Sequence, residues 1–113
     1  MARFERLIVW QKAQAFAVAV DIAAKGLRAE AALQLRKSSA SIPDNIAEGS
    51  ERDSAPQFAH FLAIAKGSCA EAQSQLRRAH ACGYLDRESF LHLIDAAQQI
   101  GWMLGALHRR WAA

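Results

Sequence analysis

Proline and glycine are scarce in this sequence, which has two prolines and six glycines among 113 residues. Both residue types destabilise helix interiors, so a chain with so few of them is suited to long helices. Hydrophobic residues make up 52% of the chain and charged residues 22%, a composition typical of globular proteins. At this length we expect residues 1–113 to form a single domain.

The sequence also lacks a long hydrophobic run. No segment approaches the roughly 20 consecutive apolar residues of a membrane span. Residues 1–6 show neither the apolar stretch nor the cleavage site of a signal peptide. We therefore expect a cytoplasmic protein without a membrane partner.

The spacing of the cysteines and histidines indicates neither a disulfide nor a metal site. Cys69 and Cys82 lie thirteen positions apart on one predicted helix, which places them about 20 Å apart and beyond disulfide reach. We expect small core residues of a reduced compartment; the alternative is a reactive thiol. The four histidines are scattered, with no His-x-x-x-His or Glu-x-x-His pair, so no metal site is expected.

Apolar periodicity predicts four helices. The first covers about residues 7–25 and ends at Gly26, and the second begins near Ala29. Ser54 caps the third helix, which Gly83 ends, and Asp86 caps the fourth. The third helix has a heptad-like seam made of Leu62, Ala65, Cys69, Ala72, Leu76 and Ala79.

The last helix carries two apolar stripes, one containing Ile94, Ala97 and Leu104 and the other Leu93 and Ile100. A bundle helix needs one buried stripe, so two stripes favour a second partner. Four helices with short connections predict an all-α, antiparallel, up-down-up-down four-helix bundle. The additional apolar stripe predicts that the bundle forms a homo-oligomer.

Pro43 lies inside the second helical pattern and leaves the carbonyl of Ser39 without its usual partner. In one interpretation Ser41 caps a new helix that contains Asp44 in its first turn. In the other, the helix continues through Pro43 with a kink. The apolar stripe keeps its phase from Leu35 to Ile46, so we favour the kink.

A polar stripe follows the same helix and comprises Ser41, Asn45, Glu48 and Arg52. Short polar side chains beside an apolar seam suggest that another protein surface comes close. These four residues and Pro43 are the candidate subunit interface. Glu48 and Arg52 could instead form an exposed pair that contributes a few tenths of a kcal/mol.

No nucleophile, base and orienting acid can be combined from this sequence, which predicts a protein without catalytic residues or cofactors. An enzyme that uses Asn45 and Glu48 at a junction between subunits is the remaining catalytic alternative. Non-enzymatic binding or scaffolding is the leading hypothesis.

Basic residues provide the main functional signal. The net charge is +3, and several basic residues occur as doublets. Alone they form a solvated face, but a ring of identical subunits would repeat them as a phosphate-binding surface. We expect Trp10, Trp102 and Trp111 to pack internally, which disfavours sequence-specific readout. The candidate nucleic-acid-binding residues are Arg36, Lys37, Lys66, Arg77, Arg78 and Arg110.

Four motifs carry a family resemblance. They are Leu7-x-Val9-Trp10-Gln11-Lys12-Ala13, Ser41-Ile42-Pro43-x-Asn45-Ile46-Ala47-Glu48-Gly49 and Phe58-x-x-Phe61-Leu62-x-Ile64-Ala65-Lys66-Gly67-Ser68-x-x-Glu71, followed by Gly83-Tyr84-Leu85. In this order they resemble the bacterial four helix bundle protein family. That family includes proteins encoded in intervening sequences of large-subunit ribosomal RNA genes and the accessory variability determinant of diversity-generating retroelements.

The resemblance implies an antiparallel bundle that assembles as a barrel-like homopentamer without enzymatic activity. It also implies RNA or DNA as a partner, and a reverse transcriptase as a protein partner. An adaptor that binds only another polypeptide is the alternative, with the basic residues serving solubility.

Overall fold

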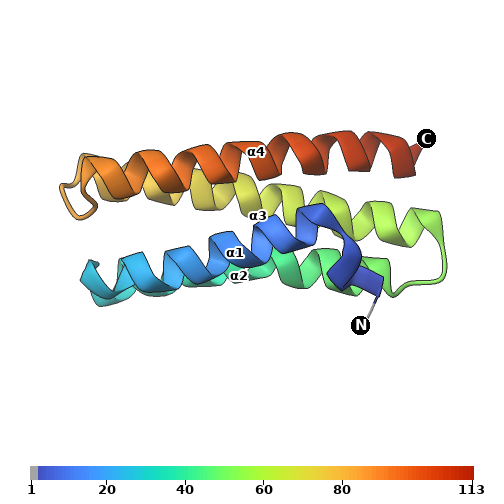
Figure 1. Ribbon diagram of the computed structural model, residues 1–113, viewed down its shortest axis with the longest axis horizontal. Helices are drawn as coiled ribbons and strands as arrows, with labels where there is room; N and C mark the ends of the chain where they lie inside the picture. The colour runs from blue at the N-terminus through green and yellow to red at the C-terminus, as the bar shows by residue number, and fades with distance from the viewer. Residues whose placement is uncertain (1–2) are drawn as a thin grey trace.

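The computed structural model describes residues 3–113 and shows an all-α chain with no strand among them. The long helices are α1 (Ile8–Ala23), α2 (Ala29–Ser50), α3 (Ala55–Ala81) and α4 (Arg87–Ala112). The short 3-10 helices η1 (Arg3–Arg6) and η2 (Ala24–Gly26) flank α1. In Figure 1 the long helices lie side by side with their connections at the ends. Residues 1 and 2 lie outside the described residues, and with them part of the segment 1–6 for which no signal peptide is expected.

The four helices enclose one hydrophobic core. Both α1 and α3 pack against α2 and α4, which gives a four-helix bundle as predicted. Burial of each large apolar side chain contributes about 1.5–3 kcal/mol. The most deeply buried large side chains include Val9, Val20, Leu35, Ile42, Ile46, Leu62, Leu76, Ile100 and Leu104.

Local hydrogen bonds set the helix ends where the sequence predicts them. The Ser54 side chain accepts from the Gln57 N–H at 3.3 Å, and Asp86 accepts from the Ser89 N–H at 2.8 Å. The bond from this N–H lowers the pKa of the Asp86 carboxyl. Gly83 adopts φ +76°, which suits the end of α3 because glycine has no Cβ to clash.

The second helix continues through its proline. Helix α2 is continuous from Ala29 to Ser50, so no new helix starts at Ser41. The kink at Pro43 stays a prediction. Within residues 3–113, the hydroxyl of Ser39, one turn before Pro43, is buried without a hydrogen-bond partner.

Both apolar stripes of α4 are buried inside this one chain. Leu93 and Ile100 from one stripe are 2% and 1% exposed, and Ile94 and Leu104 from the other are 7% and 0% exposed. The inference that two stripes need a second partner is therefore wrong. Because α4 packs against α1 on one side and α3 on the other, the bundle itself covers both stripes.

The two cysteines lie in different environments. Cys69 is buried, and burial raises the pKa of its thiol. Cys82 is exposed at the end of α3, so the prediction of two core cysteines is wrong for Cys82. The apolar seam of α3 ends at Ala79, before the helix reaches Cys82.

Candidate nucleic-acid interface

The polar stripe of α2 forms hydrogen bonds within the chain. The hydroxyls of Ser41 and Ser68 lie 2.7 Å apart and join α2 to α3. Asn45 Nδ2 donates to the carbonyl oxygen of Ser41 at 2.7 Å and to its hydroxyl at 2.9 Å. Ser38 also donates its hydroxyl to Gln75 Oε1 at 2.6 Å. Short polar residues here connect two helices of one bundle.

The other candidate interface residues differ in exposure. Pro43 is buried in the chain, whereas Glu48 and Arg52 are exposed and form an i, i+4 hydrogen-bonded ion pair. The Arg52 guanidinium lies 4.9 Å from the centre of the Phe61 ring, which places it over α3. A role of these residues between subunits stays a prediction.

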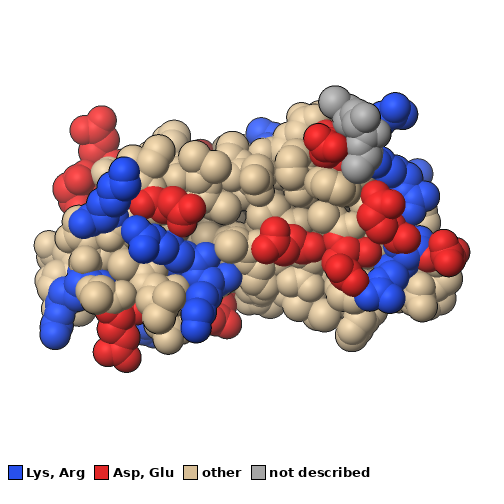
Figure 2. Space-filling view, turned by 90° about the horizontal axis from the view of Figure 1, so that it is seen from below, with Lys and Arg blue, Asp and Glu red and all other residues tan. Residues whose placement is uncertain are grey.

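The six basic candidates are exposed but do not form one patch. Arg36 and Lys37 lie on α2, where Arg36 Nε approaches Asp21 Oδ1 of α1 at 3.9 Å. Figure 2 shows the face formed by α1 and α2, with basic and acidic side chains mixed over it. Acidic side chains on this face disfavour phosphate binding by repulsion.

Lys66 and Arg77 border the seam between α3 and α4. Cys69 of α3 donates its thiol to the Ala97 carbonyl oxygen of α4 at 3.2 Å. A Cβ added at Gly101 of α4 would lie 3.5 Å from Gln73 Nε2. Positions 66, 69, 73 and 77 repeat at helical spacing, so Lys66 and Arg77 share the side of α3 that faces α4. They lie roughly 16 Å apart along the helix axis.

Arg78 and Arg110 lie away from that seam. Arg78 follows Arg77 directly, and a rotation of about 100° per residue turns it towards α2 instead. It lines a cleft beside the start of α2. Arg110 lies on the opposite side of α4 from Gly101 and Gly105 by the same spacing. The seam therefore contains two of the six candidates.

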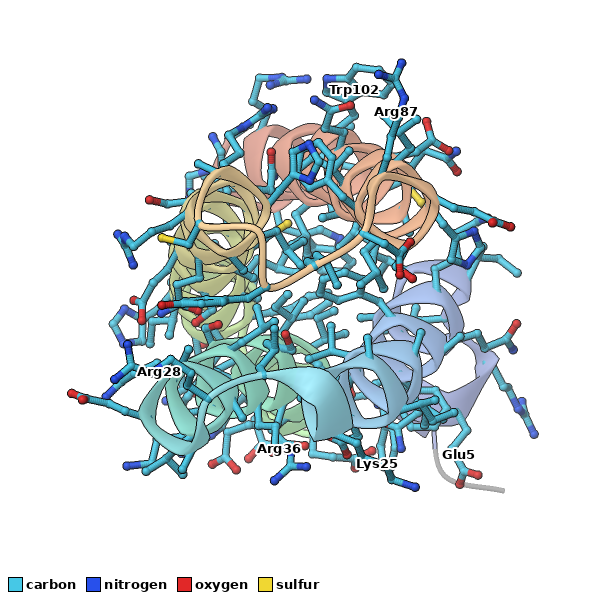
Figure 3. All side chains as sticks on the ribbon, turned by 90° about the vertical axis from the view of Figure 1, so that its left-hand side faces the viewer. Glu5, Lys25, Arg28, Arg36, Arg87 and Trp102 are labelled. Carbon is cyan, nitrogen blue, oxygen red and sulfur yellow. The ribbon has the colours of Figure 1, made fainter. Side chains whose placement is uncertain are left out.

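Trp102 is the most exposed large hydrophobic residue of the described chain, with 73% of its surface accessible. Figure 3 shows it at the outer edge of α4, pointing away from the core. This contradicts the expectation that Trp102 packs internally. Trp111 is also partly exposed, at 39%, although its ring packs against Phe58 at 5.1 Å. Trp10 is half-buried against Phe4, as expected.

A guanidinium lies on the same side of α4 as the exposed indole. Trp102, Gly105 and Arg109 follow one another at spacings of three and four residues. A Cβ added at Gly105 would lie 3.4 Å from Arg109 Nη1, so the guanidinium extends back along the helix over this glycine. We define Trp102 and Arg109 as the tryptophan face.

The charge along the outer side of α4 changes from one end to the other. Asp95 lies two turns before Trp102 and accepts a hydrogen bond from Gln99 at 2.9 Å. Arg109 and Arg110 follow Trp102 in the last turns. The tryptophan face therefore belongs to the basic half of α4, where an anion is favoured.

From the sequence, Trp102 is expected to pack internally, and Arg110 rather than Arg109 of the same doublet is the candidate site residue. The sequence does contain a signal for Trp102 and Arg109 as surface residues. Trp102 belongs to neither apolar stripe of α4, and Arg109 lies on the same side of the helix two turns later. A tryptophan that shares a helix side with Asp95 and Arg109 is a surface residue by periodicity. Assigning all three tryptophans to packing by residue type concealed this signal.

The described part of the chain shows neither a cluster of metal ligands nor a helix that could span a membrane. Among residues 3–113 no three His, Cys, Asp or Glu side chains are grouped as metal ligands. Over the same residues, no helix has the length and hydrophobicity that spanning a bilayer requires.

The fold and the face define the class: a small four-helix bundle with an exposed aromatic and basic surface. The model of the 23S rRNA-intervening sequence protein family matches residues 5–106, so the chain belongs to this family. No curated protein matches the chain.

Among solved structures, the chain resembles a protein of unknown function from the S23 ribosomal protein family of Bacteroides thetaiotaomicron VPI-5482. The two are 24% identical and superpose with a TM-score of 0.86, over 89% of this chain and 98% of the other. This likeness concerns the fold.

Proposed function

We propose that this chain is a non-enzymatic, homo-oligomeric binding module that holds single-stranded RNA on the tryptophan face. The observation that carries the proposal is the exposed indole of Trp102 on the same side of α4 as Arg109, whose guanidinium lies over Gly105. Bases stack on exposed aromatic rings, while basic side chains contact the phosphates around them.

The small residues around Trp102 support this mode of binding. Gly105 lies on the same side as Trp102, and Gly101 lies at the border with α3. Gly105 is buried beneath the Arg109 guanidinium, so the missing side chain lets Arg109 extend back along α4 towards the indole. Asn45 forms a hydrogen bond with Ser41, and Glu48 pairs with Arg52. These contacts give less support to the alternative of an enzyme with its site between subunits.

The outer side of α1 supports assembly of several copies. Ile8, Val18 and Ile22 are 56%, 51% and 63% exposed, and exposed Ala15 lies between them. These residues repeat at near-heptad spacing, as on helices that pack against another helix. We propose that sister chains cover this side of α1, in place of the α4 stripes. The family resemblance sets the proposed number at five.

The test of binding uses a single-stranded RNA and a DNA of the same sequence in band-shift titrations at several salt concentrations. We expect affinity to fall steeply between about 50 and 200 mM salt. Replacing Trp102 with alanine should cost about 1–3 kcal/mol of binding free energy, the usual contribution of one stacked base. Arg109→Gln should weaken binding and reduce the salt dependence by about one ion.

Leu91→Ala and Arg87→Gln are the matched controls, since both residues are exposed on α4 towards its other end. Binding should persist in both. A missing band shift, or one that salt leaves unchanged, would remove the proposal. Equal loss in Arg87→Gln and Arg109→Gln would indicate unspecific charge attraction.

Light scattering tests the assembly. We expect one species several times heavier than the 12.4 kDa chain, and Val18→Glu should reduce it to single chains because a charge cannot be buried unpaired. A natural chain that is monomeric at micromolar concentration would contradict assembly. The exposed side of α1 would then favour the second candidate function, an adaptor whose partner is another polypeptide.

A further inference from the structure

A cleft of about 470 Å³ opens between the start of α2 and the end of α3. Ligand pockets commonly have volumes of roughly 300–1,000 Å³, so a small molecule fits this space. Its apolar lining includes the buried side chains Leu35 and Ala79 and the half-buried Leu27 and Ala31. Such a lining favours an apolar ligand body.

Two guanidinium groups lie at this cleft. Arg28 Nη1 donates to the Tyr84 hydroxyl at 3.1 Å, and its guanidinium carbon lies 5.9 Å from the centre of the Tyr84 ring. Arg78 reaches the cleft from α3. Figure 3 shows Arg28 at the side of the bundle, between the start of α2 and the end of α3. The contact with Tyr84 orients Arg28 towards the wall of the cleft.

The acidic side chain at the cleft does not cancel this charge. Glu30 is the one acid among the lining residues, against Arg28 and Arg78. The lining therefore carries a formal charge of +1, since two cations and one anion are present. Polar uncharged lining comes from Gln34 and Gln75. An anionic group is favoured next to the two guanidiniums.

The backbone adds to the same preference. Side chains of Ser54 and Asp86 cap α3 and α4, but no side chain caps α2 at Arg28. The first N–H groups of a helix point outward and carry partial positive charge. Because the first residues of α2, from Ala29 onward, line the cleft, these groups lie at its edge.

We propose that this cleft binds a small amphipathic anion, with its apolar body on Leu35 and Ala79 and its carboxylate or phosphate between Arg28 and Arg78. The cleft is separate from the tryptophan face. Arg77 borders the α3–α4 seam while its neighbour Arg78 lines the cleft, so the two arginines distinguish the two sites.

The test measures binding of anilinonaphthalene sulfonate, an aromatic anion that fluoresces in apolar surroundings, and its displacement by decanoate or phenyl phosphate. We expect Arg78→Gln to weaken binding about tenfold, as for loss of a charge-assisted hydrogen bond. Arg77→Gln is the matched control and should leave the affinity unchanged. Inorganic phosphate, which lacks an apolar body, should displace the dye poorly.

Two further measurements locate the ligand. Ala31→Phe fills the cleft and should abolish binding while circular dichroism confirms an intact helical fold. Cys82 lines the cleft and is exposed, whereas Cys69 is buried. Bound decanoate should therefore slow alkylation of Cys82 several-fold.

Equal effects of Arg77→Gln and Arg78→Gln would overturn the proposal, because they would show attraction to general charge. Full binding by a folded Ala31→Phe variant, or unchanged alkylation of Cys82 at saturating decanoate, would also overturn it. The absence of dye and decanoate binding at millimolar concentration would do the same. None of these outcomes affects RNA binding on the tryptophan face, which Trp102→Ala tests.

Discussion

The seam between α2 and α3 and the seam between α3 and α4 are built from different side chains. Across the first, hydroxyls and amides form hydrogen bonds, such as the 2.7 Å contact between Ser41 and Ser68. Gly49 of α2 also brings the two helices together, because a Cβ there would lie 2.6 Å from Phe61 Cβ. Across the second, Gly101 has ordinary contact distances of 3.5 Å or more.

We call the tightly packed α2–α3 seam the closed seam and the less crowded α3–α4 seam the open seam. In the α2–α3 seam the small and polar residues satisfy one another, so they hold the bundle together. In the α3–α4 seam the glycines are less crowded, and basic side chains and Trp102 lie along its outer border. Small residues alone therefore do not show whether a surface is for packing or for binding.

The largest expected effect breaks the closed seam. Gly49→Ala should lower the free energy of unfolding by about 2 kcal/mol, as overpacking commonly does. The neighbours include the Cβ of Phe61 at 2.6 Å and the backbone oxygen of Phe58 at 3.4 Å, which cannot move away without a shift of α3. Chemical denaturation with urea measures the change.

Gly101→Ala is the matched control in the open seam. Its Cβ would meet Gln73 Nε2 at 3.5 Å and Cys69 Sγ at 3.7 Å, which are ordinary contacts. We expect stability within about 0.5 kcal/mol of the natural chain or above it, since alanine favours helix. If both glycine variants lost the same stability, the contrast between the seams would be refuted.

Removal of a hydrogen bond across the closed seam should have a smaller effect. Ser38→Ala deletes the donor to Gln75 Oε1 and should lower stability by about 1 kcal/mol. Thermal unfolding in parallel with Ser74→Ala, an exposed serine of α3, separates the loss of the Ser38 hydroxyl, which also donates to the Leu35 carbonyl oxygen at 3.2 Å, from the change in helix propensity. A Ser38→Ala variant as stable as the natural chain would argue against this contact.

The adjacent serine should respond in the opposite direction. Ser39 is fully buried, and its hydroxyl has no partner within the described residues. Ser39→Ala removes this unpaired group and should raise the free energy of unfolding by up to about 1 kcal/mol. A loss of stability measured by urea denaturation would show that the hydroxyl does form a bond, for example to a carbonyl of the preceding helical turn.

An exposed glycine of α3 should give a small gain. Nothing lies within 4 Å of a Cβ added at Gly67, so Gly67→Ala meets no obstacle. The substitution should stabilise the chain by about 0.5–1 kcal/mol, the difference in helix propensity. If calorimetry showed a loss of stability, close approach of another chain to this side of α3 would be the explanation.

The smallest effect on stability is expected at Trp102. With 73% of its surface exposed, Trp102→Ala should change the free energy of unfolding by less than about 0.5 kcal/mol. The same variant should weaken RNA binding by about 1–3 kcal/mol, so stability and function separate at this residue. A large loss of stability together with a smaller assembly would place Trp102 between subunits.

The sequence by itself determined the helices and their ends. Ser54 and Asp86 each cap a helix through an N–H three residues later, and Gly83 ends α3 through its own backbone angle. Such interactions join near neighbours in the chain, so they are visible in the sequence. The same locality made the four-helix class predictable.

Only the tertiary structure decided what covers each helix side. Ser41 finds its partner in Ser68, 27 positions away, and α4 buries both apolar stripes because it packs against α1 and α3 together. Helical periodicity shows which residues share a side, but the neighbour on that side depends on how the helices pack. For that reason the bond between Ser41 and Ser68 across the α2–α3 seam became visible only in the folded chain.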